Sequence, residues 1–348
     1  MPDERIEVIV GVDTHTDTHA AVAIDQHGRR LDIIEVEANR AGYRKLLAWA
    51  CRLGELSAVG VEGTGSYGVG LSRFLTSVGV MVIEVGRVNR QHRRRYGKSD
   101  PVDAEAAARA VLSGEANGVP KSRDGIVESI RTLHVVKRSA IKARTQAANQ
   151  MANLIVTAPD TTRAELRGLS ALKRARRAAK WRPGTGHDPA IVTRRAIRSL
   201  ARRWLDLTDE ITAHNRDLDE LVALAAPHLV AEHGVSRDVA AKLLIAVGDN
   251  PGRIRTESSF AALCGVNPVS ASSGKTNRHR LNRSGDRQAN NALWVIAMVR
   301  LRSDPATRAY ADRRKKEGLS HREIVRCIKR YLARRLYPIL LEDLAALT

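Results

Sequence analysis

Apolar and polar positions follow two different periods in the first 113 residues. Short apolar, β-branched runs predict five strands, at residues 8–12, 20–24, 31–36, 58–61 and 80–85. Apolar residues at helical spacing predict helices at 41–52 and 66–77. Pro101 predicts the start of a further helix, because proline is favoured in the first helical turn, and Asp100 or Ser99 can cap it.

The predicted order is three strands, helix, strand, helix, strand, helix. Short polar bends separate the first three strands, so we expect an antiparallel meander there. This order is that of the ribonuclease-H-like fold, to which RuvC-type nucleases belong. We therefore expect an α/β, ribonuclease-H-like (RuvC-like) domain over residues 1–117.

Strand signals disappear between about residues 124 and 230. An apolar seam at alternating spacings of three and four predicts a coiled-coil helix, with members Ile197, Leu200, Trp204, Leu207, Ile211, His214, Leu218 and Leu221. A helix at 126–156 is its expected antiparallel partner, and a basic stretch at 173–182 lies between the two. The seam fits packing within the chain and dimerisation equally well. We assign residues 118–228 to a helical coiled-coil linker.

Residues 229–348 are predicted to form a mainly α-helical C-terminal domain. His233-Gly234-Val235 precedes a helix at 236–247 in a pattern that resembles a helix-hairpin-helix, whose turn amides can hold a DNA phosphate. Further helices are expected at 258–263, 290–301 and 306–344. Residues 268–286 read as a polar, basic loop.

Charge narrows the class of partner. The 348 residues carry 58 Lys and Arg against 38 Asp and Glu, a net charge of +20, which favours nucleic acid. The three cysteines are far apart and indicate a reducing compartment without a zinc module. Neither a membrane-spanning run nor a signal-peptide pattern is present, so we expect a soluble, cytoplasmic protein without a membrane partner.

Four carboxylates stand at positions where a sheet gathers ligands. Asp13 ends the first predicted strand and Glu62 the fourth, while Asp100 and Asp103 share one face at a helix start. Such like charges repel one another unless a cation binds, and an oxygen-only ligand set suits Mg²⁺, with Mn²⁺ as the alternative. We predict a metal site suited to phosphodiester chemistry.

Each of these residues also has a purely structural interpretation, as a turn, cap or helix-dipole residue, and only their joint arrangement favours a metal site. A competing pattern lies nearby: Asp13, His15, Asp17 and His19 alternate, so a continuous strand would place them on one face as a zinc-like cluster. We consider that alternative weaker, because the strand is expected to bend there.

A second chemical candidate is the segment Cys264-Gly265-Val266-Asn267-Pro268, followed by Ser270-Ala271-Ser272-Ser273-Gly274-Lys275. A serine beside glycine on a loop can approach a backbone phosphate, and the surrounding Arg and Lys would neutralise the phosphate charge. The same residues are also ordinary loop chemistry, and the spacing is not that of a Walker A loop.

These motifs together resemble the IS-one-ten (IS110) family of DEDD transposases, which are related to the Piv invertases. The resemblance covers nearly the whole chain. It rests on the stretches VIVGVDTHTDTHAAVAID, AVGVEGTGSY, GKSDPVDAEAAARA, HGVSRDVAAKLLIAVGD and FAALCGVNPVSASSGKTNRHRLNRSGDRQANNAL. Two departures are the Ser-Gly-Lys sequence, where many relatives have Ser-Gly-Gly-Lys, and Arg283, where many have Lys.

The resemblance implies a RuvC-like domain, a coiled-coil linker and a C-terminal transposase domain with a catalytic serine. The catalytic and metal-binding tetrad then falls on Asp13, Glu62, Asp100 and Asp103, and the serine on Ser273, with Ser272 as the neighbouring alternative. It also implies a structured noncoding guide RNA encoded by the element. Nucleic-acid contacts are expected from the basic residues Lys98, Lys173, Arg174, Arg176, Arg177, Lys275, Arg278, Arg280, Arg283 and Arg287.

We therefore predict a transposase, or site-specific DNA recombinase, of an insertion sequence. It would act on the element ends and target DNA through a covalent phosphoserine intermediate, as a homo-oligomer, dimer or tetramer. Two alternatives stay open. One is a RuvC-like, metal-dependent junction nuclease that forms no covalent intermediate. The other is a basic nucleic-acid-binding protein without enzymatic activity.

Overall fold

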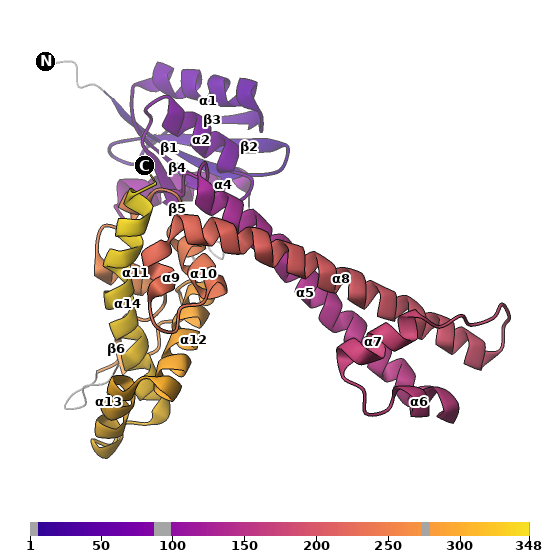
Figure 1. Ribbon diagram of the computed structural model, residues 1–348. Helices are drawn as coiled ribbons and strands as arrows, with labels where there is room; N and C mark the ends of the chain where they lie inside the picture. The colour runs from indigo at the N-terminus through magenta and orange to yellow at the C-terminus, as the bar shows by residue number, and fades with distance from the viewer. Residues whose placement is uncertain (1–5, 87–98, 273–278, 348) are drawn as a thin grey trace, which may run out of the picture. The chain divides into compact units, whose positions relative to one another are not determined.

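The computed structural model describes residues 6–86, 99–272 and 279–347 (Figure 1). The chain divides into two compact units, Met1–Ser122 and Arg123–Thr348, and each is described separately below. The finer predicted boundaries at residues 117 and 228 stay predictions. Among the described residues, no helix combines the length and the apolar character that crossing a membrane requires.

The N-terminal unit contains a five-stranded mixed sheet in the order β3-β2-β1-β4-β5. Its strands are β1 (Glu7–Thr14), β2 (Thr18–Asp25), β3 (Arg30–Glu37), β4 (Glu55–Glu62) and β5 (Val82–Val85). The first three strands pair antiparallel, while β4 pairs parallel with both β1 and β5. The predicted meander is confirmed, and so is the predicted order of strands and helices over residues 6–86 and 99–112.

Helices cover both faces of this sheet. Helices α1 (Arg40–Leu53) and α2 (Val69–Ser77) pack on the face that carries Val10 and Val12, while α4 (Asp100–Leu112) packs on the face that carries Ile9 (Figure 1). Helix α2 begins three residues later than predicted, because residues 63–68 form turns. Odd-numbered residues at the end of β1 therefore face α4.

Glycines bring α4 unusually close to the sheet. A Cβ atom on Gly11 would lie 2.0 Å from the carbonyl oxygen of Ala104, and one on Gly60 would lie 2.6 Å from Val111. The contacting side of α4 is rich in alanine, so helix and strands approach almost backbone to backbone. This close contact places the first turn of α4 beside the ends of β1 and β4.

The second unit begins with two long helices, α5 (Ile126–Thr157) and α8 (Pro189–Ala225). The start of α5 shares a buried cluster with the end of α8, and the end of α5 shares another with the first half of α8. The helices therefore run antiparallel, as predicted (Figure 1). The seam residues Ile197, Trp204, Ile211 and Leu218 are buried within the single chain. Intramolecular packing thus accounts for the seam without a second copy.

Two shorter helices lie between α5 and α8 in the sequence. Helix α6 (Asp160–Leu166) was not predicted, and α7 (Ala171–Ala179) carries the predicted basic stretch. The remaining elements are α9 (Pro227–Ala231), α10 (Arg237–Val247), η1 (Pro251–Arg253), α11 (Glu257–Leu263), β6 (Val269–Ser270), β7 (His279–Arg280), α12 (Arg287–Ser303), α13 (Pro305–Lys316) and α14 (His321–Ala345).

One expectation for the C-terminal part was wrong. The segment 268–286 is not only a loop, because β6 and β7 pair antiparallel as a short ribbon. The tail is helical, as predicted, and is divided into two helices, because α13 ends before Gly318, whose φ of +88° favours glycine, and Ser320 caps α14 through a capping box.

Candidate metal centre and nucleic-acid interface

Two predicted carboxylates lie at the ends of adjacent parallel strands. The register pairs Val12 of β1 with Val61 of β4, so Asp13 and Glu62 occupy the next positions along each strand. The Thr14 hydroxyl donates a hydrogen bond of 2.8 Å to the Glu62 carbonyl and joins the two strand ends. This edge is where an open sheet usually binds ligands.

The other two predicted carboxylates come from the first turn of α4. Asp103 is buried, with 2% of its surface exposed, whereas the side chain of Asp100 is half exposed. Burial raises the pKa of the Asp13 carboxyl, the nearby His15 lowers it, and the Asp103 and Asp100 carboxylates raise it further. Three carboxylates thus lie within electrostatic reach of one another, which favours a bound cation.

His15 completes this cluster. Its Nε2 atom lies 3.3 Å from Asp13 Oδ2 and 3.4 Å from Asp100 Oδ1. One ligand atom from each of Asp13, His15 and Asp100 lies within 4.8 Å of the others, a spacing that can hold a metal ion. The predicted tetrad omitted His15, although the Asp-x-His spacing at a strand end was a usable signal.

The zinc-like alternative, with four ligands on one strand face, is wrong. Residues 13–19 span the bend between β1 and β2 rather than one strand. Only His15 remains beside Asp13. His19 is buried and stacks on the ring of Tyr43, at 5.8 Å between centroids.

The donor set fits a hard divalent cation. Carboxylate oxygens suit Mg²⁺, and one imidazole nitrogen in addition is better suited to Mn²⁺. The half-exposed side chains of His15 and Asp100 leave the cluster accessible from solvent. Residues from β1, the following bend and α4 therefore converge on one place that is chemically suited to a divalent metal.

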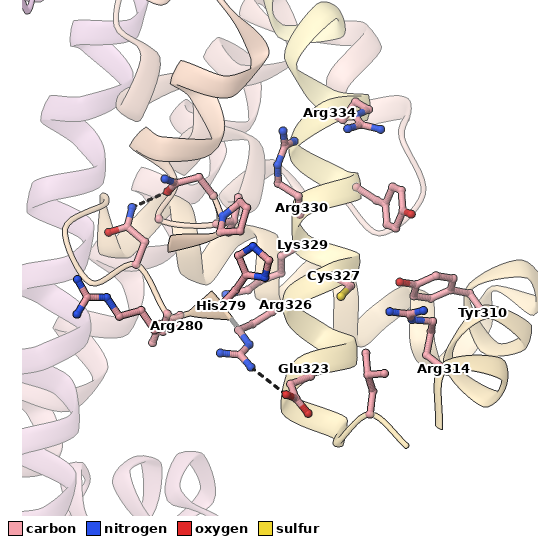
Figure 2. A pocket seen from close by; sticks show the side chains of 18 of the residues that line it. His279, Arg280, Tyr310, Arg314, Glu323, Arg326, Cys327, Lys329, Arg330 and Arg334 are labelled. Carbon is pink, nitrogen blue, oxygen red and sulfur yellow. Dashed lines mark hydrogen bonds and ion pairs between the residues drawn. The ribbon is translucent and has the colours of Figure 1, made fainter. Parts of the chain in front are cut away.

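The second predicted region, around the serine segment, adjoins a basic cavity of about 890 Å³ in the C-terminal unit (Figure 2). The wall comes from the 265–268 turn, the ribbon strand β7, α13 and one side of α14. Its charged residues are predominantly basic: His279, Arg280, Arg313, Arg314, Arg326, Lys329, Arg330 and Arg334, against Glu317 and Glu323.

The two ends of the serine segment are tied together at its base. Asn282 donates to the Asn267 side chain at 2.6 Å, and the Asp286 amide donates to the Leu263 carbonyl at 2.6 Å. A Cβ on Gly285 would lie 2.2 Å from the Gly265 nitrogen, so only glycine allows this approach. Ser272 is exposed, while Ser273 lies outside the described residues.

The predicted nucleic-acid contacts occupy several places in the fold. Lys173, Arg176 and Arg177 are exposed on α7, whereas Arg174 is partly buried and donates to the Leu169 carbonyl. Of the others, Arg280 lines the cavity, and Arg283 and Arg287 are exposed near the start of α12. Lys98, Lys275 and Arg278 lie outside the described residues.

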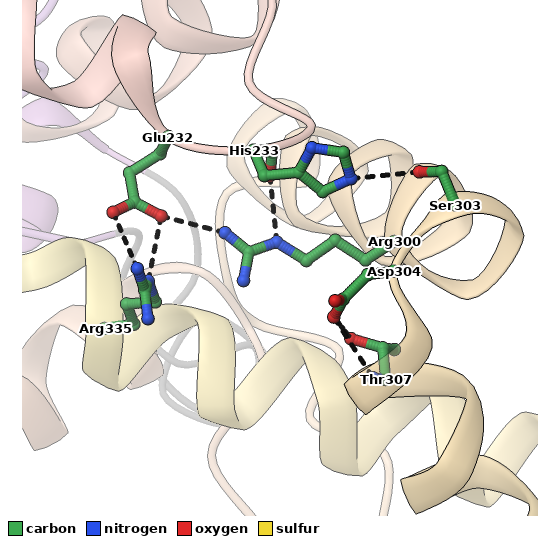
Figure 3. Close-up of polar contacts among 7 residues, drawn as sticks. All are labelled: Glu232, His233, Arg300, Ser303, Asp304, Thr307 and Arg335. Carbon is green, nitrogen blue, oxygen red and sulfur yellow. Dashed lines mark hydrogen bonds and ion pairs between the residues drawn. The ribbon is translucent and has the colours of Figure 1, made fainter.

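Not every arginine of this unit is available to a ligand. Glu232 accepts hydrogen bonds from Arg300 at 2.9 Å and from Arg335 at 2.8 and 3.0 Å (Figure 3). These bonds from Arg335, outweighing the effect of burial, lower the pKa of Glu232, with Arg300 contributing less. Arg300 also donates to the His233 carbonyl, so the network fixes the turn that resembles a helix-hairpin-helix. We assign these two arginines a structural role.

The net positive charge lies wholly in the second unit. Residues 1–122 contain 16 Lys and Arg and 16 Asp and Glu, whereas residues 123–348 contain 42 and 22. A neutral α/β unit with an acidic, metal-type cluster and a strongly basic helical unit together define the class of proteins that process nucleic acid.

Comparison with known proteins identifies the family to which this chain belongs within that class. Residues 10–158 match the DEDD transposase model of IS110 elements, and residues 228–312 match the model described as "Transposase IS116/IS110/IS902 family". These two matches cover well over half of the chain. The chain belongs to the IS110 family of transposases, which are enzymes.

Individual relatives agree with this assignment. The "Mini-circle putative transposase for IS117" of Streptomyces coelicolor is 23% identical over 92% of this chain and 91% of its own length. The "Insertion element IS110 uncharacterized 43.6 kDa protein" of the same organism is 30% identical, over 40% of this chain and 34% of its own length. An IS900 protein of Mycobacterium paratuberculosis is 30% identical over 26% of this chain and 23% of its own length.

Proposed function

We propose that this protein is the transposase of an insertion sequence, a DNA recombinase with a metal-assisted acidic site and a serine nucleophile. The observation that carries the proposal is the convergence of Asp13, Asp100 and His15 at the end of a sheet strand. The sheet order, with β1, β4 and β5 parallel and β2 antiparallel, supports a ribonuclease-H-like, RuvC-like domain around this cluster.

The acidic residues are proposed to position the scissile phosphate. Asp13, Glu62, Asp100 and Asp103 would hold Mg²⁺, or Mn²⁺, with His15 beside them. When bound, such an ion neutralises phosphate charge and stabilises the leaving oxygen. The buried Asp103 and the partly buried Asp13 supply fixed negative charge, and the hydrogen bond between Thr14 and Glu62 fixes the spacing of the strand ends.

Ser273, or its neighbour Ser272, is proposed as the nucleophile. Its hydroxyl oxygen forms a bond to phosphorus, the bond from phosphorus to one sugar oxygen breaks, and the hydroxyl proton passes to that leaving oxygen. A free strand end then attacks the phosphoserine and restores the serine. The basic residues around the segment, Arg280 among them, would lower the cost of bringing an anionic backbone to the hydroxyl.

Two further parts of the proposal rest on the family resemblance. One is a structured noncoding RNA, encoded by the element, that pairs with target and donor DNA. The low aromatic content of 3% is compatible with sequence readout by base pairing. The other is a homo-oligomer, a dimer or a tetramer, in the active complex.

Covalent capture of DNA tests the enzymatic proposal. A labelled element end, intact at the cleavage site but nicked a few nucleotides away so that the released fragment diffuses off, is incubated with protein, the element's noncoding RNA and Mg²⁺, and adducts are separated on a denaturing gel. We expect an adduct with the unmodified protein and none after Ser273→Ala, with DNA binding unchanged. Adduct formation in both Ser273→Ala and Ser272→Ala would overturn the serine role.

The acidic site is tested in the same assay. Asp13→Asn should abolish adduct formation, while Asp17→Asn, an exposed aspartate in the adjacent bend, should not. Cleavage without any trapped adduct would instead favour the junction nuclease. An adduct that survives both Asp13→Asn and metal removal would overturn the role of the acidic site, and the absence of both adduct and cleavage with the unmodified protein would favour a non-enzymatic binding protein.

A further inference from the structure

Lys329 places a buried positive charge against the basic cavity. Only 7% of its surface is exposed, it lines the cavity, and its Nζ donates to Asn290 Oδ1 at 2.8 Å. Across the part of the chain that the structure describes, no carboxylate lies within ion-pair distance of it. Burial and the neighbouring Arg326 lower the pKa of Lys329, so an anion in the cavity would stabilise its charged form.

Some, but not all, of the other cations of the cavity are also without a counter-charge. Arg330 pairs with Glu257 and Arg314 with Glu317, so these two are neutralised inside the protein. Arg280 and Arg334, by contrast, have no carboxylate partner among residues 6–86, 99–272 and 279–347, and Arg326 has only Glu323 at 3.7 Å. The cavity thus presents several uncompensated positive charges.

These residues form a regular stripe on α14. Arg326, Arg330 and Arg334 repeat every four residues, and Cys327 and Tyr331 follow one position later. In Figure 2 the His279 ring of the ribbon lies in the same part of the cavity as Arg326 and Lys329. Basic and ring-bearing side chains therefore line one space.

An accessible aromatic face distinguishes this cavity from a plain phosphate site. Tyr331 is 55% exposed, and its ring is braced edge-on by Tyr310 at 5.7 Å between centroids. A base can stack on such a ring only when it is unstacked from its own neighbours, which requires a single strand. The volume of about 890 Å³ lies within the roughly 300–1,000 Å³ range of pockets that enclose small ligands.

We propose that this cavity binds a single-stranded stretch of nucleic acid, with a base on Tyr331 and backbone phosphates on Lys329, Arg326 and Arg334. The inference rests on the proposed function, since strand exchange exposes single strands, and it names the form of substrate that the C-terminal unit holds. DNA and RNA share this chemistry, so both belong in the test.

Fluorescence anisotropy with labelled 12-nucleotide single-stranded DNA, single-stranded RNA and duplex DNA tests the proposal on the full-length protein. Tyr331→Ala should weaken single-strand binding about 5- to 100-fold, and Tyr331→Phe should restore it, because the stacking face is kept. Duplex affinity should change less than twofold in both variants. Equal single-strand affinity in Tyr331→Ala and the unmodified protein would overturn the stacking contact.

Salt dependence tests the phosphate contacts. Arg334→Gln should reduce the slope of log affinity against log salt by about 0.7 on a single strand, the value for one lost phosphate contact. The matched control is Arg322→Gln, an exposed arginine of α14 outside the cavity, for which no change in slope is expected. Lys329→Met, a second variant, removes another proposed phosphate contact, and its thermal transition shows whether it is folded.

The outcomes separate this inference from the proposed function. Identical slopes for Arg334→Gln and Arg322→Gln on both single strands would overturn the cavity, even if covalent capture of DNA succeeds. Reduced slopes with no covalent capture would support the cavity and count against the recombinase mechanism. If these variants lose affinity for duplex DNA alone, the single-strand assignment would also be overturned.

Discussion

Gly11 determines how close the acidic turn of α4 comes to the strand that carries Asp13. In Gly11→Ala the new methyl group would lie 2.0 Å from the Ala104 carbonyl and 2.3 Å from the Ala108 nitrogen, so α4 must move. We expect the N-terminal unit to lose about 1–3 kcal/mol of unfolding free energy. Metal affinity should fall as well, because Asp100 and Asp103 move with the helix. Urea unfolding and calorimetric titration with Mn²⁺ measure the two effects.

The control for this substitution is Gly86→Ala, at an exposed site where no atom lies within 4 Å of the new Cβ. It should leave both stability and metal affinity unchanged. If Gly11→Ala unfolds like the unmodified protein, the close packing of α4 on β1 does not determine the geometry of the site.

His15 is expected to set the metal preference of the acidic cluster. An imidazole nitrogen favours Mn²⁺ over Mg²⁺ more than a carboxylate oxygen does. His15→Ala should therefore weaken Mn²⁺ binding by about tenfold, with a smaller effect on Mg²⁺. Titration calorimetry with each ion measures the ratio, and His27→Ala, at an exposed turn, is the control. An unchanged ratio would remove His15 from the ligand set.

For single residues, the sequence predicted where the acidic residues lie in strands and helices better than it predicted which side chains they contact. Asp13 and Glu62 could be placed because each ends an apolar strand, and Asp100 and Asp103 because they precede a helical pattern. His15 was assigned only to the weaker alternative, since it lies in a bend whose direction the strand period does not specify. The burial of Lys329 was also beyond prediction, because it depends on Asn290 of another helix.

At the scale of elements, Asp238 joins α10 to the long helix α5. Its carboxylate accepts from Lys137 and Lys242, each at 2.8 Å. Burial alone would raise its pKa, but these hydrogen bonds prevail and lower the pKa to about 2. The carboxylate therefore stabilises the fold above its unfolded pKa of about 4, and that contribution is lost as the pH falls from 4 toward 2.

Asp238→Asn should lower the stability of the C-terminal unit near pH 7 by about 1 kcal/mol, a modest value because the side chain is 40% exposed. The difference from the unmodified protein should shrink as the pH falls from 4 to 2. Urea midpoints across that range measure it, with the exposed Asp217→Asn as control. A constant difference across this range would contradict the role of the Asp238 charge.

Long, periodic elements were the ones that the sequence could predict. Helix α5 and strands β1 to β4 agree with their patterns to within a few residues, and α8 contains the whole predicted seam, because each buries one regular face. Strands β6 and β7 have two residues each, too few for any period to show. Helix α6 was missed for the same reason, since its seven residues bury only Thr162 and Leu166.

At the scale of the whole molecule, charge and metal chemistry are divided between the two units. The first unit has no net charge and contains the acidic cluster, while the second carries the full excess of 20 positive charges. Each unit has hydrophobic clusters of its own, which suggests that each can fold alone. Nucleic-acid affinity and metal affinity should therefore separate when the chain is divided.

We expect residues 123–348 alone to bind duplex DNA with nearly the affinity and salt slope of the full chain, because they contain all of the net charge. Residues 1–122 should bind DNA weakly but retain the Mn²⁺ affinity of the full chain, because Asp13, His15, Asp100 and Asp103 all lie there. Anisotropy from about 50 to 200 mM salt and Mn²⁺ titration measure these properties, after circular dichroism has confirmed that each fragment is folded. If folded 1–122 binds DNA with the slope of the full chain, residues of the neutral unit dominate backbone recognition. The division of roles between the two units would then be wrong.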